Sequence, residues 1–226
     1  MSHNPRIIAG MFAWLVMGGD HTDILEAGIG KAWTGGQAVV TRLDLAGRKG
    51  PRPIVVVTPD RTKARRAPRW PEVLDDWKDI YEDALFPEPE LAVLAEEISG
   101  LGAPAACVFG GPGLAQGTVA WYEKGALISY EHVGSASVSW DPEDGLGRPF
   151  DGTAASIAAL GGKRLAKLFG SDKTIDVMTR IDNANRAIGE VLITRVFYRF
   201  LDTDPPPIDD LAGLVATASP TRINCR

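Results

Sequence analysis

The sequence predicts an α+β fold, in which helices pack on a largely antiparallel sheet of five to six strands. Three observations lead to this class. Strand-like segments are separated by short turns. Helical patterns occur in blocks instead of alternating with single strands. Residues 117–134 have the pattern of a β-hairpin whose turn is Lys124-Gly125.

The hairpin carries much of this prediction because its side chains alternate between two faces. Pairing across the turn places Tyr122 opposite Leu127, Trp121 opposite Ile128, and Val119 opposite Tyr130. The last four residues share one face. An aromatic and aliphatic face of this kind needs a cover, and two helical patterns follow it in the chain.

The first strands are predicted from apolar runs and alternation. Residues 7–17 are apolar, which favours a buried strand over a short helix. Residues 18–36 are rich in glycine and turn-forming residues and predict a loop, with one helical turn at 24–27. Residues 37–45 alternate as a half-buried strand does.

A turn is expected at 47–53, followed by a central strand at 54–57. This strand has four β-branched residues in a row and is closed by Thr58-Pro59-Asp60. A helix is then predicted at 71–84, with Pro71 at its first position. A second helix, at 90–99, is stopped by Gly100.

The remainder consists of one strand, the hairpin and two further helices. The strand is expected at 105–109. The first helix is expected at 153–169, and the last begins after Ser171. The run 191–201 is apolar almost all round, and we favour helix over a final strand.

We divide the chain into one α+β domain, residues 1–201, and an acidic, Pro-rich tail, residues 202–226. The tail contains Pro205-Pro206-Pro207 and is expected to be extended or mobile unless a partner orders it.

The composition limits the cellular compartment and the classes of partner that the protein is expected to have. The formal net charge is −5, which argues against a nucleic-acid binder. Two cysteines, Cys107 and Cys225, fit a reducing compartment better than a disulfide framework. No run is long enough to cross a bilayer, and the start lacks a signal-peptide layout. We expect a soluble cytoplasmic protein, and the abundance of Ala, Gly, Arg and Pro suits a bacterial, GC-rich genome.

The densest group of possible metal ligands is Asp20-His21-Thr22-Asp23, with Glu26 nearby. A polar loop that caps a helix explains the same residues, and we predict no metal site. The alternative is an enzyme, a hydrolase or transferase, whose carboxylate–His site uses Asp20, His21 and Asp23. Glu131 and His132 would join this site if the two strand ends met.

Other motifs lack the context that their chemistry needs. Gly110-Gly111-Pro112-Gly113 resembles a phosphate loop in composition, but Pro112 removes an N–H and no Lys follows at the required spacing. Cys107 has Ala, Val and Phe beside it, which indicates a buried structural thiol and not a nucleophile. We predict no cofactor.

Basic and aromatic residues in predicted loops are the candidate contact residues. They are Arg61, Lys63, Arg65, Arg66, Arg69, Trp70 and Trp140. The basic loop could dock an acidic partner or lie solvated beside the acidic helix that follows. Loop tryptophans, Trp33 included, could be interface anchors or lids on the core.

These observations favour a non-catalytic protein that acts through protein–protein contact, as a regulatory, scaffold, immunity or assembly component. A protein partner is expected, and a homo-oligomer is compatible with the sequence.

Overall fold

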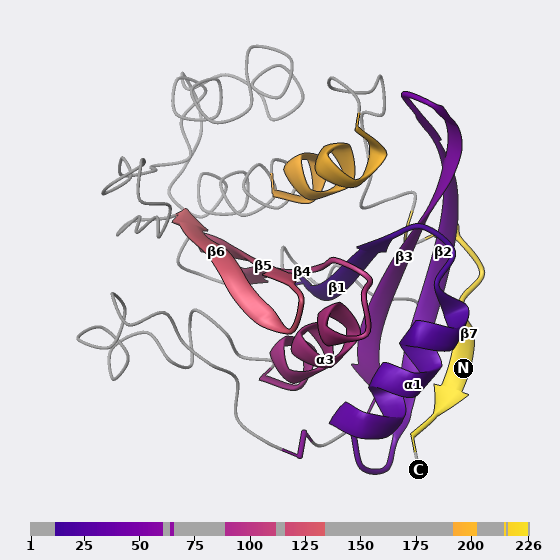
Figure 1. Cartoon of the computed structure of the whole chain (residues 1–226), viewed down its shortest axis with the longest axis vertical. Helices are drawn as coiled ribbons and strands as arrows, with labels where there is room; N and C mark the ends of the chain where they lie inside the picture. Colours follow the sequence, from indigo (N-terminus) through magenta and orange to yellow (C-terminus); the bar gives the residue numbers. More distant parts are fainter. Residues whose placement is uncertain are drawn as a thin grey trace, which may run out of the picture.

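Figure 1 presents the computed structural model of the chain, which describes residues 12–60, 64–65, 89–111, 116–133, 192–202, 215 and 217–225. Within these ranges seven strands form one sheet in the order β6-β5-β4-β1-β3-β2-β7. All neighbouring strands are antiparallel. The α+β class and the antiparallel sheet are therefore confirmed, with seven strands where we expected five to six.

The elements have the following bounds: β1 Phe12–Gly18, α1 Thr22–Ala32, β2 Gln37–Gly47, β3 Gly50–Asp60, α3 Pro89–Gly100, β4 Ala105–Gly111, β5 Gln116–Glu123, β6 Ala126–Val133 and β7 Thr221–Asn224. Residues 192–201 are also helical, as favoured from the sequence.

The sheet is covered on both faces, which explains why β1 reads as a continuous apolar run. Leu15 and Met17 pack in one cluster with α1 and α3. Trp14 and Val16 pack in a second cluster with the 192–201 helix. Figure 1 shows α1 and α3 on one side of the sheet and this helix, in orange, on the other.

The prediction that 18–36 is a loop with one helical turn is wrong, because α1 has 11 residues. Its buried residues are Leu25, Gly28, Ile29 and Ala32, spaced as one helical face. Gly28 and Gly30 lower the intrinsic helix propensity, but packing against α3 outweighs that cost. A Cβ on Gly28 would lie 2.7 Å from Cγ1 of Ile98.

The turn expected at 47–53 is shorter in the structure. Gly47 pairs with Gly50 across Arg48 and Lys49, and the β2–β3 pairing continues to Gln37 and Asp60. The strand also does not stop at Thr58. Only residues 54–57 of β3 pair with β1. The three prolines of β3, Pro51, Pro53 and Pro59, lie outside that stretch. The N–H that each proline lacks therefore costs no hydrogen bond to β1.

The β5–β6 turn is confirmed at Lys124-Gly125. Positive φ angles at both residues, 52° and 76°, fit a type I′ turn. Tyr122 pairs with Leu127 as predicted.

A β-bulge then shifts the register, so the other two predicted pairs of the hairpin are wrong. Trp121 pairs with Ser129, and Val119 pairs with Glu131. Ile128 is the additional residue and is 37% exposed. A shift by one residue moves every later side chain to the opposite face.

The hairpin turn is attached to α3 through Ser99. The Ser99 hydroxyl accepts a hydrogen bond from the Gly125 N–H, at 3.0 Å, and donates to the Glu96 carbonyl, at 3.1 Å. Gly100 and Gly125 meet where the two elements touch, since a Cβ on Gly125 would lie 3.4 Å from the Gly100 Cα. The α3 helix and the 105–109 strand are both confirmed.

The end of the expected tail forms the seventh strand. Thr221 to Asn224 of β7 pair with β2, and the side chains of Gln37 and Asn224 are hydrogen-bonded at 2.8 Å. The division between domain and tail stays a prediction. The helices expected at 71–84, at 153–169 and after Ser171, and the Pro205-Pro206-Pro207 segment, lie outside the described residues.

A pair of glycine substitutions in α1 tests the contact with α3. Gly30 is exposed and has no atom within 4 Å of an added Cβ, so Gly30→Ala should stabilise the protein by about 0.5–1 kcal/mol. Gly28→Ala should instead destabilise it by about 1–3 kcal/mol, because the methyl group meets Ile98. Urea denaturation followed by circular dichroism measures both. Equal shifts in the two variants would contradict the close α1–α3 contact.

Candidate functional site

A cleft of about 450 Å³ opens where β1 ends and the 192–201 helix ends. We call it the β1-end cleft. Its lining comes from widely separated parts of the sequence: Gly18, Gly19, His21, Arg52, Pro104, Trp121, Glu123, Arg199 and Phe200.

The Gly18-Gly19 pair shapes one wall of this cleft. A Cβ on Gly18 would lie 2.6 Å from Cδ1 and 2.8 Å from Cβ of Phe200, so the helix can approach β1 only because residue 18 is glycine. Gly19 has φ +100°, which favours glycine, and a Cβ there would meet Nε2 of His21 at 2.8 Å. The glycines therefore let Phe200 and the His21 imidazole lie close to the backbone.

Arg52 joins β3 to the helix. Its Nη1 donates a hydrogen bond to the Phe200 carbonyl at 3.2 Å, and the Arg48 N–H donates to the Leu201 carbonyl at 3.2 Å. These bonds satisfy carbonyls of the last helical turn, and the guanidinium complements the negative end of the helix dipole. Asp202 ends the helix with φ +53°. Within the described residues, the other Arg52 N–H donors have no hydrogen-bond partner.

Trp121 and Phe200 form an aromatic wall. Their ring centroids are 5.3 Å apart, with an angle of 50° between the planes. The Arg199 guanidinium lies over Trp121, 4.1 Å from its centroid, in a cation–π contact. Arg199 Nη2 is 3.6 Å from Glu123 Oε1, and both side chains are nearly half exposed, so this ion pair is weak.

The charge of the β1-end cleft is opposite in sign to that of the chain. Among the described residues, the lining of the cleft has two guanidinium groups and one carboxylate, whereas the chain has a formal net charge of −5. His21 adds a half-buried imidazole. It occupies the N-cap position of α1 without making a side-chain capping hydrogen bond. Such a lining attracts an anion and offers several N–H donors to it.

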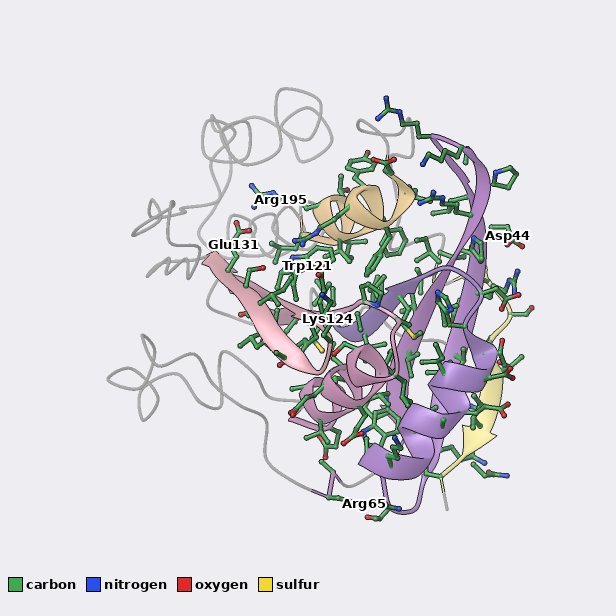
Figure 2. All side chains as sticks on the ribbon, viewed as in Figure 1. Asp44, Arg65, Trp121, Lys124, Glu131 and Arg195 are labelled. Carbon is green, nitrogen blue, oxygen red and sulfur yellow. The ribbon has the colours of Figure 1, made fainter. Side chains whose placement is uncertain are left out.

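A second group of residues, partly or fully exposed, overlaps the cleft on the 192–201 helix and β5–β6. We call Trp121, Glu123, Glu131, Arg195 and Arg199 the Arg–Trp surface. Arg195 Nη1 forms an ion pair with Glu131 Oε1. Figure 2 shows Arg195 and Glu131 facing each other, with Trp121 near the helix.

Asp20, from the alternative catalytic site, is engaged elsewhere. Its carboxylate is 2.8 Å from Arg42 Nη1 and accepts a hydrogen bond from the Thr22 hydroxyl at 3.1 Å. The Arg42 guanidinium lowers the pKa of Asp20, and Thr22 adds to this effect. Asp23 and Glu26 are exposed. The part of the chain that the structure describes contains no cluster of three potential metal ligands.

The strand register keeps His132 away from His21. His132 pairs with Thr118, near the end of the hairpin that lies opposite the Lys124-Gly125 turn. His21 follows β1, whose last residues neighbour Ala105 and, through it, Tyr122 at the turn end. The structure therefore does not bring together the two halves of the alternative site.

Of the predicted contact residues, only Arg65 is described. It is exposed, and its N–H donates to the Ala32 carbonyl at 3.0 Å. Arg61, Lys63, Arg66, Arg69, Trp70 and Trp140 lie outside the described residues. Trp33 is fully buried, and its Nε1 donates to the Glu90 carbonyl at 2.7 Å, so it belongs to the core.

Both cysteines are buried and free. The Cys107 thiol donates to the Leu91 carbonyl at 3.2 Å, and burial raises its pKa well above the ordinary value. Burial also raises the pKa of Cys225. Cys107 is therefore a structural thiol, as expected.

Comparison with known proteins gives no relative: no family model, curated protein or solved structure matches the chain. None of the described helices has the length and hydropathy needed to cross a membrane. The geometry of the cleft and the Arg–Trp surface is therefore the basis for inferring function.

Alkylation tests the assignment of Cys107. In the folded protein at pH 8, iodoacetamide should leave Cys107 unmodified for hours, because the thiol is buried and its pKa is raised. In guanidinium chloride it should react within minutes. Peptide mass spectrometry reports the modified residue, and rapid labelling of folded Cys107 would contradict the assignment.

The Asp20–Arg42 pair predicts a pH dependence. Because the folded pKa of Asp20 is lowered, its stabilising effect is present above the ordinary pKa and is lost as the pH falls through the lowered value. Carboxyl ¹³C NMR should give a midpoint below the ordinary Asp value. Arg42→Gln should raise it.

Lys49→Gln is the matched control, since it removes one positive charge from the exposed β2–β3 turn. It should leave the Asp20 midpoint in place. An equal rise of the midpoint in both variants would mean that overall charge, and not the ion pair, lowers the pKa.

Proposed function

We propose that this protein acts without catalysis, by contact with a protein partner, and that the Arg–Trp surface is the contact. The observation that carries the proposal is the stack of Arg199, which is about half exposed, on the partly buried Trp121. The Arg195–Glu131 ion pair lies on the same surface. Trp and Arg are the residue types that dominate the energetic centres of protein interfaces. A planar stack loses little side-chain entropy when a partner covers it.

The charges of this surface favour a partner of mixed polarity. Arg195 and Arg199 are one helical turn apart, and each has a carboxylate on the neighbouring strands. Exposed ion pairs contribute little to folding, so they are free to exchange partners at an interface. Their main effects there are on orientation and on the rate of association.

The chemistry of the described residues is consistent with a binding role. Asp20 is held by Arg42, and Cys107 is buried. General acid–base catalysis depends on a group that is positioned for proton transfer.

We also propose a cytoplasmic location, a bacterial source, self-association of the chain, and a role in partner contact for the acidic, Pro-rich segment that precedes β7. Two free, buried cysteines support a reducing compartment.

Affinity purification of the tagged protein from its native cell tests the proposal. A stoichiometric partner should be retained by the unmodified chain. Charge reversal by Arg195→Glu should weaken its binding by about 30-fold or more, which corresponds to a loss of about 2 kcal/mol. Isothermal calorimetry with the purified partner measures the change.

Lys49→Glu and Arg65→Glu are the controls, because both reverse one exposed positive charge outside the Arg–Trp surface. Binding should be unchanged in both. Loss with Arg65→Glu alone would move the interface to the basic loop around residues 61–69. A clean eluate without a partner would refute the proposal.

A further inference from the structure

We propose that the β1-end cleft is a binding site for a small organic carboxylate with an apolar or planar body. The cleft shares Trp121, Glu123 and Arg199 with the Arg–Trp surface. The inference needs no protein partner, because Arg52 and His21, which would bind the carboxylate, lie outside that surface. Its anchor is Arg52, which has one hydrogen bond, to the Phe200 carbonyl, and further N–H donors without partners within the described residues. A guanidinium group recognises a carboxylate with two parallel hydrogen bonds.

The charges around the cleft favour a single negative charge. Apart from His21, the titratable side chains of the described lining are Arg52, Arg199 and Glu123, which leave one net positive charge. The carbonyl end of the 192–201 helix also borders the cleft, because the Phe200 carbonyl accepts from Arg52. This end and Glu123 repel a second negative charge, so a phosphate dianion is a poorer match than a carboxylate.

The size and lining indicate the remainder of the ligand. A cleft of about 450 Å³ is far larger than a carboxylate and lies in the range of small-molecule sites. Trp121, Phe200 and Pro104 provide apolar surface beside the charged groups. The His21 imidazole, held against Gly19, can donate one further hydrogen bond.

NMR titration of the full chain with matched probes tests the site. The carboxylates are benzoate and indole-3-acetate, and their neutral counterparts are benzamide and indole-3-acetamide. Amide signals of Gly18, Gly19 and His21 should shift saturably with the carboxylates. The neutral probes should bind at least tenfold more weakly.

Variants identify the anchor. Arg52→Gln should weaken carboxylate binding at least tenfold, and Arg65→Gln, which removes an exposed positive charge elsewhere, should leave it unchanged. Since Arg52 also contacts the helix end, His21→Gln serves as a second variant and should weaken binding about threefold or more. Circular dichroism and the unshifted amide signals verify folding.

Several results would overturn the proposal. These are equal binding of acids and amides, shifts that do not saturate, or carboxylate affinity unchanged in both Arg52→Gln and His21→Gln. Binding of a short acidic peptide without binding of the small carboxylates would also overturn it. None of these results depends on whether Arg195→Glu loses a protein partner.

Discussion

The structure depends on the burial of β1 on both faces. Leu15, Val16 and Met17 have no exposed surface, and β1 is hydrogen-bonded on one side to β3 and on the other to β4. A strand in this position must be covered twice. The α1–α3 pair covers one face, and the 192–201 helix covers the other with an apolar stripe that includes Ile193, Val196 and Phe197. The second of the two clusters therefore joins β1 to a segment nearly 180 residues further along the chain.

The β1-end cleft forms where the 192–201 helix, which covers the second face of β1, ends. The 192–201 helix approaches β1 so closely that only glycine fits at residue 18. Its last carbonyls are then satisfied by the β2–β3 hairpin, through Arg52 and the Arg48 N–H. The same contacts that stop the helix also hold Arg52 and Phe200 at the rim of the cleft. The arrangement of the site is thus a consequence of packing and helix capping.

The sequence predicts the strands better than the site, for physical reasons. Four β-branched residues at 54–57 and the Lys124-Gly125 turn act locally, so β3 and the β5–β6 hairpin were recognisable. The sequence does not predict helix α1, because Gly28 lowers the helix propensity. Gly28 allows the close contact with Ile98 of α3, which only the folded structure reveals. The bulge at Ile128 has no local signal that fixes the register. The cleft joins residues from several distant segments, and of its lining the sequence indicates only His21 as a candidate site residue.

The choice of arginine at position 52 connects stability with recognition. Three other arginines of the described part, Arg42, Arg195 and Arg199, have carboxylate partners within 4 Å. Arg52 contacts a neutral carbonyl instead, and within the described residues no carboxylate forms an ion pair with it. A lysine has a compact charge that could meet the carbonyl, but it lacks the planar fork that holds a second acceptor in a fixed direction. Guanidinium can cap the helix with one N–H and present the others to the cleft. This dual capacity is why a residue that closes the fold can also be the anchor of a binding site.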